Sequence, residues 1–569
     1  MLISSVKKIN HIINTKVKRL IFYTLFVSVL SIFFETISIG MVVPIISGLL
    51  QAEFSGFFIF EIANNFFNAN EFNEKIKFLL IFLSILFISK LIFSLISVIL
   101  KMNLIHQFNN DLQLNLFRKY IFMDWEKYIS RNPSILIRNI QGECSILKSG
   151  IVDSLIILFT ETIFFIFIII LLLLFIPAIT LGILFLIFIF GYIFFKLIKN
   201  KIVGYSEKRL KISEFTFNYI IETLQSLKDI VIYNKQTFFL NRFIPKNYSY
   251  HDYQKKIGIL NSLPRIMLEL ITFLMLLTSI TILLYQKLPA EELISTLGLL
   301  VLAASRLMPS SSKIIVALQS IKSSQVVLEN IYNEINSNNN IYKENKKTDV
   351  KFTNINLKNI SYSYNSSQEQ ILKNIDVEIK KNQSTAIIGK SGSGKSTLIE
   401  IICGLLKPSS GDIIIDGKLI SNIKLFWGNK ISYVSQKNFV FSDTLKRNIT
   451  MESDDKKVNL SKLEEVMQIC RLNHYDSNKE LKESGSNLSG GERQRISIAR
   501  ALYNEPNFLI FDEATNSLDQ ALEKEIFDII KSINNITIII ISHNPELVDF
   551  CNKIYLIENK KIKEISESI

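Results

Sequence analysis

The chain has little cysteine. Only four occur among 569 residues, and they form no CxxC pair and no metal-ligand spacing. Scattered cysteines of this kind are typical of buried or reduced thiols in a protein that faces the cytosol. We also expect no cleavable secretion signal, because the first apolar run is too long for a signal peptide and lacks a small-residue cleavage site. The net charge of +13 does not indicate a nucleic-acid partner. Lys, Ile and Asn are abundant throughout the chain, as an AT-rich genome would produce, so the positive charge follows from the overall composition.

Apolar residues are abundant: hydrophobic residues make up 49% of the chain, which includes 42 Phe, and the excess lies in the N-terminal half. A helix that spans a bilayer needs about 20 predominantly apolar residues. Six stretches meet this requirement: residues 20–50, 76–104, 150–176, 178–198, 262–286 and 292–318. We therefore predict an all-α transmembrane domain with six spans over residues 1–333.

The polar segments predict the topology of these spans. Basic residues before the first span place the N-terminus in the cytoplasm: Lys7, Lys8, Lys16, Lys18 and Arg19. An even number of spans returns the chain to the same side. The long basic stretches 105–149 and 199–261 are expected to be helical extensions into the cytoplasm. Residues 53–67 are amphipathic and predict either a helix on the outer membrane surface or a loop helix that packs on its own protein.

A second domain follows a polar, low-complexity linker over residues 334–350. The chain then turns strand-like and carries the pattern "GKSGSGKST" between an apolar strand and a helical run. This is the context that a phosphate-binding loop requires. We expect the loop to hold ATP phosphates through the following residues: Gly389, Lys390, Ser391, Gly392, Ser393, Gly394, Lys395, Ser396 and Thr397. Lys395 adds positive charge and Ser396 a magnesium ligand.

The run "FLIFDE" supplies the second half of this site. Four apolar residues predict a buried strand that ends at Asp512, which is suited to hold Mg²⁺ through water. Glu513 follows and is the candidate general base. The run "LSGGERQRISIARAL" lies shortly before and opens a helix whose N-terminal amides can face an anion. Residues 351–569 are thus predicted to form an α/β ATPase domain.

With these motifs in this order, the chain resembles the ABC transporters of the exporter type. The resemblance implies a homodimer, because each ATP would lie between the loop of one copy and the signature of the other. It assigns adenine stacking to Tyr364, with Tyr362 as the second candidate. The remaining implied residues are Gln436 at the metal site, Ser489, Gly490 and Gly491 in the signature, Asp519, and the switch His543. Glu492 departs from the glutamine more common in exporters.

Charged residues also interrupt the predicted spans. The cations are Lys90, Arg265, Arg306 and Lys313, and the acids are Glu35, Glu161 and Glu269. Such groups usually face a bundle interior or a cavity. Two interpretations stay open. Internal ion pairing is favoured for Arg265, whose helix carries Glu269 four residues on. A cationic lining for an anionic cargo is favoured by Arg306 and Lys313, which share one helix face without a nearby acid in their own helix.

Three membrane motifs sharpen the resemblance: "FFETISIGMVVP", "LPRIMLE" and "LAASRLMPS" are similar to the bacterial flippase of lipid-linked oligosaccharides. This implies a polyprenyl-pyrophosphate glycan as cargo, met by the four cations, and a multi-pass protein of the bacterial inner membrane with its ATPase domain in the cytoplasm. The alternative is export of another lipid of the lipid A type, a drug or a peptide. No peptidase-like domain precedes the first span, which argues against the peptidase-bearing peptide exporters.

Overall fold

The computed structural model describes residues 2–49, 72–175, 177–285, 290–337, 352–364, 369–420, 423–427, 430–436, 438–482, 485–513, 520–533, 535–542 and 544–565. The chain forms two compact units. Met1–Met123 and Ser130–Ile341 make the first, and Asp124–Ile129 with Tyr342–Ile569 make the second. The amphipathic segment 53–67 and residues 338–350 of the expected linker lie outside the described residues.

The described part of the first unit is helical. Its helices are α1 (Leu2–Ile12), α2 (Thr15–Gly40), α3 (Val42–Leu49), α5 (Phe72–Ile121), α7 (Pro133–Arg138), α8 (Cys144–Leu147), α9 (Ser154–Phe175), α10 (Pro177–Gln225), α11 (Leu227–Ile232), α12 (Gln236–Tyr285), α13 (Ala290–Ser323) and α14 (Gln325–Asn336). Two π-helical stretches, Asn139–Glu143 and Lys148–Asp153, flank α8. The helices α5, α10 and α12 each run for about 50 residues, which confirms the predicted extension of the helices beyond the apolar spans.

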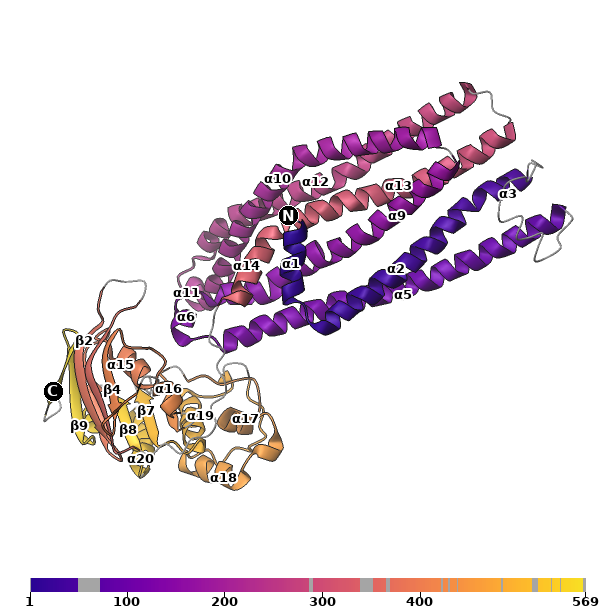
Figure 1. The fold of residues 1–569 in the computed structure, drawn as a ribbon. Coiled ribbons are helices and arrows are strands. Elements are labelled where there is room, and N and C mark those ends of the chain that lie inside the picture. Colours follow the sequence, from indigo (N-terminus) through magenta and orange to yellow (C-terminus); the bar gives the residue numbers. More distant parts are fainter. Residues whose placement is uncertain are drawn as a thin grey trace. The chain divides into compact units, whose positions relative to one another are not determined.

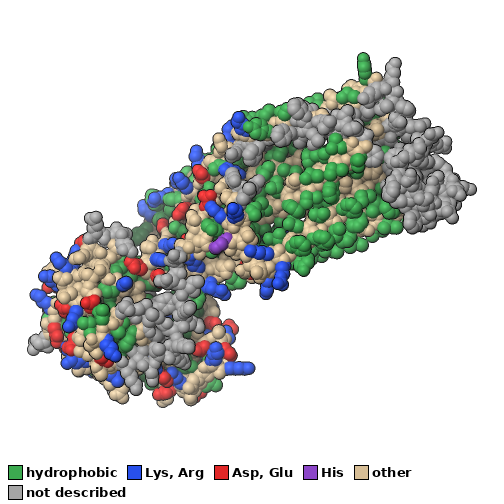
Figure 2. Space-filling model, viewed as in Figure 1, with side chains coloured by type: hydrophobic (Ala, Val, Ile, Leu, Met, Phe, Trp, Pro, Cys, Tyr) green, Lys and Arg blue, Asp and Glu red, His purple; other side chains and the backbone are tan. Residues whose placement is uncertain are grey.

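Length and composition make five helical segments of the described chain suitable for crossing a membrane: Thr15–Gly40, Lys77–Ile121, Pro133–Leu174, Gln236–Ile282 and Thr296–Ser323. The predicted span 178–198 begins α10, where most side chains lie outside the description. Hydrophobic side chains cover the visible face of the long helices (Figure 2). On α5, Ile88 and Leu95 are 56% and 65% exposed. A soluble protein rarely exposes so continuous an apolar surface, whereas a lipid-facing helix requires one.

The long helices pack in pairs that the chain order alone does not specify. α2 lies beside α5 and also contacts α9, while α13 packs between α9 and α12 (Figure 1). One buried cluster joins α2, α9 and α13 and includes Ile32, Ile168 and Leu299. Contacts among these three helices therefore bring together the charged residues of separate spans.

The second unit is an α/β domain with two sheets. Its strands are β1 (Asn354–Tyr362), β2 (Leu372–Lys380), β3 (Ser384–Ile388), β4 (Ser410–Ile415), β5 (Lys418–Leu419), β6 (Ile431–Val434), β7 (Phe508–Asp512), β8 (Thr537–Ile541), β9 (Lys553–Glu558) and β10 (Lys561–Ile565). Its helices are α6 (Trp125–Ile129), α15 (Lys395–Ile402), α16 (Ile423–Trp427), α17 (Leu445–Thr450), α18 (Leu460–Ile469), α19 (Gly490–Tyr503), α20 (Gln520–Ser532) and α21 (Pro545–Asp549). The predicted architecture, a helical domain with segments of membrane-spanning composition followed by an α/β domain, is confirmed.

The strand order of the larger sheet positions the candidate site. This sheet runs β10-β9-β3-β8-β7-β6, and its central pairs are parallel. Every residue of β7 and β8 is buried, as expected for strands covered on both faces. The carboxyl ends of parallel strands meet at one edge of a sheet, where open α/β sheets bind ligands. The phosphate loop after β3, Gln436 after β6 and Glu513 after β7 are placed at that edge.

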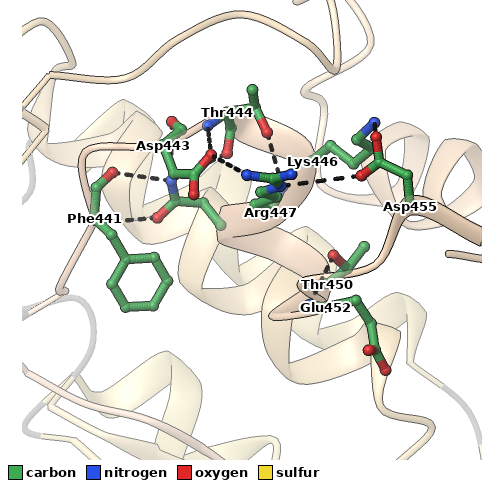
Figure 3. Close-up of polar contacts among 9 residues, drawn as sticks. Phe441, Asp443, Thr444, Lys446, Arg447, Thr450, Glu452 and Asp455 are labelled. Atoms are coloured by element: carbon green, nitrogen blue, oxygen red, sulfur yellow. Dashed lines mark hydrogen bonds and ion pairs between the residues drawn. The ribbon is translucent and has the colours of Figure 1, made fainter. Parts of the chain in front are cut away.

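A helical subdomain lies between β6 and β7 in the chain, and polar contacts hold its first helix (Figure 3). Thr444 caps α17 by accepting the Arg447 amide at 3.2 Å. The Arg447 guanidinium lies 3.5 Å from Asp443. Asn448 Oδ1 accepts the Phe441 amide at 2.9 Å, and its Nδ2 donates back to the Phe441 carbonyl at 3.0 Å. These bonds define the path of the chain that follows Gln436.

Candidate functional site

Two glycines shape the phosphate loop. Gly389 follows β3 with φ +152°, and a Cβ there would lie 2.5 Å from the Ile557 carbonyl oxygen. Gly394 caps α15 in the left-handed region at φ +104°, where a Cβ would lie 2.8 Å from Leu372 Cδ2. Neither position tolerates a side chain, so the backbone N–H groups stay open to an anion at the start of α15.

Lys395 stabilises the loop from within. Its side chain is 6% exposed, and Nζ donates to the Gly389 carbonyl at 2.6 Å and to the Lys390 carbonyl at 3.2 Å. The neighbouring Ser396 hydroxyl is exposed, whereas the side chain of Thr397 is buried, which leaves its backbone N–H as the group available to a phosphate. Ser393 Oγ is buried without a hydrogen-bond partner in the described chain, as a group that awaits a ligand would be.

The acidic residues at the end of β7 meet this lysine. Glu513 Oε1 lies 3.7 Å from Lys395 Nζ, and Gln436 Nε2 donates to Glu513 Oε2 at 3.0 Å. Glu513 adopts a left-handed backbone, φ +46°, in which its N–H donates to the Ile541 carbonyl at 2.9 Å. A non-glycine residue in this region is strained, and such strain persists where surrounding contacts impose it. Three residues predicted from separate motifs therefore converge on one point.

Sequence reasoning missed Tyr433, which contacts the predicted metal-binding residue. The Tyr433 hydroxyl donates to Asp512 Oδ2 at 2.6 Å from the adjacent strand β6. Burial raises the pKa of Asp512, and the hydrogen bond from Tyr433 acts in the opposite direction. Burial and the contact with Asp512 both raise the pKa of Tyr433. Tyr433 thus orients the carboxylate that would hold a metal. The only sequence signal was its place three residues before Gln436.

Tyr433→Phe is expected to raise the Mg²⁺ concentration needed for half-maximal ATPase activity by about tenfold, because Asp512 loses the donor that orients it. Titration of ATPase activity with Mg²⁺ measures this effect. Tyr503→Phe is the matched control, since its hydroxyl accepts the Asn459 amide away from the phosphate loop. An unchanged Mg²⁺ dependence in Tyr433→Phe would remove the orienting role.

The two tyrosine candidates for adenine stacking differ in exposure. Tyr362 is 2% exposed within the core of the smaller sheet. Tyr364 is partly exposed and contacts Tyr362 edge-on, with ring centroids 5.1 Å apart. An accessible ring face is needed to stack on a base, so the geometry favours Tyr364.

The donors at the sheet edge suit a nucleotide with magnesium. Mg²⁺ is usually held by one or two carboxylates together with substrate phosphates. The oxygen donors predicted for it are Ser396, Gln436 and Asp512. Within the described chain, no group of three or more His, Cys, Asp or Glu side chains forms an all-protein metal site.

The signature residues lie at the start of α19. Ser489 caps the helix by accepting the Glu492 amide at 3.3 Å, and Glu492 Oε2 accepts the Ser489 amide at 2.6 Å. Burial opposes the ionised Glu492, but hydrogen bonds from Tyr475 and Ser489 together hold its pKa below the usual value. Glutamate at this position therefore completes a capping box.

The signature does not reach the phosphate loop of its own chain. Across the described residues, no hydrogen bond or ion pair joins Ser489, Gly490 or Gly491 to residues 389–397. Arg500 Nε, further along α19, instead donates to the Asn448 carbonyl at 2.7 Å, and burial lowers its pKa. Asp519 and His543 lie outside the described residues.

A short helix from the first half of the chain belongs to the second unit. Trp125 Nε1 of α6 donates to Glu400 Oε1 at 3.1 Å on the helix that begins at Lys395. Burial raises the pKa of Glu400, and the Trp125 bond opposes that shift.

The four candidate cations of the membrane unit all have carboxylate partners. Arg265 Nε lies 3.2 Å from Glu269 Oε1, which confirms the predicted i+4 pair. The other pairs cross between helices: Lys90–Glu35 at 3.2 Å, Arg306–Glu35 at 2.8 Å and Lys313–Glu161 at 2.6 Å. Periodicity within one helix could not reveal these acids, which explains why Arg306 and Lys313 had no partner in the sequence analysis.

Comparisons with known proteins agree with both units. Residues 37–304 match the family model described as ABC transporter transmembrane region, and residues 372–516 match the model described as ABC transporter. A Staphylococcus aureus (strain NCTC 8325 / PS 47) protein named "Putative multidrug export ATP-binding/permease protein" is 36% identical over 227 residues. Its namesake from strain COL matches equally. The match spans 38% of this chain and 38% of each relative.

A solved structure shares the fold. It is titled "Structure of a bacterial Atm1-family ABC exporter with ATP bound", with a TM-score of 0.77 and 18% sequence identity. The likeness covers 97% of this chain and 95% of that one. At this identity the likeness concerns the arrangement of the chain alone.

Proposed function

We propose that this chain couples ATP hydrolysis to export across the bacterial inner membrane. It has the membrane and ATPase regions of an exporter-type half-transporter of the ABC transporter family. The observation that carries the proposal is the convergence of Lys395, Gln436 and Glu513 at the edge of the larger sheet. The apolar helices of the first unit supply the membrane path.

The working form is a homodimer. Ser489, Gly490 and Gly491 lie at the start of a capped helix and make no hydrogen bond or ion pair with their own phosphate loop in the described chain. A second copy would bring its signature to the γ-phosphate, so each ATP would be enclosed by both copies. Because each copy has one phosphate loop and one signature, the dimer would have two complete ATP sites.

The residues of each site divide the work of hydrolysis. Lys395 neutralises charge on the phosphates, and Glu513 accepts a proton from the water that attacks the γ-phosphorus. Gln436 holds Glu513 in place through its amide. Ser396, Gln436 and Asp512 would hold Mg²⁺, which supplies further neutralisation of phosphate charge. His543 and Asp519 keep the roles that the family resemblance implies.

We infer that the cargo is an anionic lipid-linked oligosaccharide with a polyprenyl-pyrophosphate head group. Arg306, Lys313, Lys90 and Arg265 are cations on helices of membrane-spanning composition, where charge is costly and usually functional. Arg306 and Lys313 line a cavity of about 120 Å³ together with Glu35 and Glu161. Export of another lipid, a drug or a peptide is the second candidate, favoured by the multidrug-export name of the relatives.

The combined variant Arg306→Ala with Lys313→Ala is expected to lower cargo translocation about tenfold or more, since charge-assisted contacts to the head group are lost. Basal ATPase activity should stay within about twofold, because both changes lie outside the nucleotide site. Lys196→Ala, an exposed lysine on α10, is the control. Unchanged translocation by a folded double variant would make the cationic face structural.

A further inference from the structure

The membrane unit contains a cluster of charged residues drawn from four helices. Glu35 lies on α2, Lys90 on α5, Glu161 on α9, and Arg306 with Lys313 on α13. All except Lys90 line the same cavity of about 120 Å³. The cluster holds three cations and two carboxylates, which leaves one positive charge in excess.

Glu35 bridges two helices through a single oxygen. Oε1 lies 3.2 Å from Lys90 Nζ and 2.8 Å from Arg306 Nη2, and the Glu35 side chain is 17% exposed. Among the residues that the structure describes, this buried oxygen has no partner with hydrogen-bond alignment. Both contacts are therefore ion pairs that lack the directional part of a charge-assisted hydrogen bond.

Glu161 is bound more tightly, through both of its oxygens. Oε2 accepts the Ser310 hydroxyl at 2.5 Å, and Oε1 accepts Lys313 Nζ at 2.6 Å. Ser310 follows Pro309, which interrupts the hydrogen bonds of α13 and lines the cavity. The ion pairs of Arg306 and Lys313 thus lie on either side of Pro309, where α13 is most easily bent.

These contacts have a consequence for any anion that enters the cavity. Both carboxylate side chains are 17% exposed, whereas the Arg306 and Lys313 side chains are 48% and 58% exposed. An anion in the cavity can therefore reach the two cations at which the carboxylates are already bound. The resident carboxylates and the anion therefore compete for the same positive charges.

We propose that Glu35 and Glu161 are resident counter-ions that an anionic phosphate or diphosphate group displaces from Arg306, Lys313 and Lys90. This inference rests on the anionic cargo proposed above and adds how the site selects it. Arg306 and Lys313 are seven residues apart, about 10 Å along the helix, so each has its own carboxylate. A group with several negative charges can replace both carboxylates, whereas a neutral head group replaces neither.

The test measures binding of farnesyl diphosphate to the purified full-length protein by calorimetry. Every protein carries Lys395→Ala, so that the phosphate loop does not take up the probe. Glu35→Gln with Glu161→Gln is expected to raise the affinity about 5- to 20-fold, because a neutral amide no longer competes. Farnesol, which has the same chain without charge, should show no gain.

Matched variants separate competition from a change in shape. Glu269→Gln removes the exposed i+4 partner of Arg265 and should leave the affinity within about twofold. Glu161→Asp keeps the charge and should also show no gain, and the single glutamine variants should each show part of it. Unchanged or weaker binding in folded glutamine variants would overturn the proposal. Failure of both single variants to fold would also overturn it, because the carboxylates would then be structural.

The result is distinguishable from a failure of the proposed cargo. A gain in diphosphate affinity without transport of a lipid-linked glycan would leave the counter-ion role standing and refute that cargo. Transport of the glycan without a gain in diphosphate affinity would support that cargo and refute the counter-ion role.

Discussion

Glu513→Gln is expected to lower the ATPase rate by about 10²- to 10⁴-fold while ATP still binds. The substitution keeps the size of the side chain, and its amide can still contact Gln436 and Lys395, which lie 3.0 Å and 3.7 Å from the carboxylate oxygens. An amide does not accept a proton from water, so the chemical step loses its base. Steady-state phosphate release and equilibrium ATP binding, measured on the same sample, separate the two effects.

An exposed acid of the same domain provides the control. Glu464 lies on the surface of α18, and its change to glutamine should leave both measurements within about twofold. Rapid hydrolysis by Glu513→Gln would assign the base to another group.

Lys395→Ala is expected to weaken ATP binding by about 100-fold or more, because a buried charge that meets the phosphates is removed. The change also deletes the bonds from Nζ to the Gly389 and Lys390 carbonyls, so the loop itself should loosen. Glu513 loses its cation partner at the same time. Fluorescent-nucleotide titration measures the binding, and calorimetric unfolding shows whether the domain stays folded.

Lys407→Ala is the matched control for this substitution, since Lys407 is an exposed lysine of the same domain that lies outside the phosphate loop. Affinity within about twofold of wild type is expected there. Full ATP affinity in folded Lys395→Ala would mean that the backbone of the loop suffices to hold the phosphates.

The convergence of the candidate nucleotide-site residues at one edge of the sheet was predictable from sequence, because these residues follow buried parallel strands. Gly389, Gln436 and Glu513 each come directly or almost directly after such a strand, and the ends of parallel strands meet. The apolar length of the spans likewise predicted the helices of the first unit, since a bilayer demands a continuous apolar helix.

Contacts between separate helices or strands could not be predicted from the sequence in this way. Glu35 and Glu161 pair with cations on other helices, and helical periodicity relates only residues of one helix. Tyr433 reaches Asp512 across neighbouring strands, so its role depends on the strand order rather than on a motif. Trp125 contacts Glu400, 275 residues later in the chain. Each of these residues became apparent only once the packing partners of its element were known.

ATP-dependent movement of a fluorescent polyprenyl-pyrophosphate glycan between the leaflets of proteoliposomes tests the proposed export function most directly. Wild-type protein should move the glycan with ATP, and Glu513→Gln, which keeps ATP binding, should not. Brisk ATP hydrolysis by wild type without any movement of the glycan would contradict this cargo.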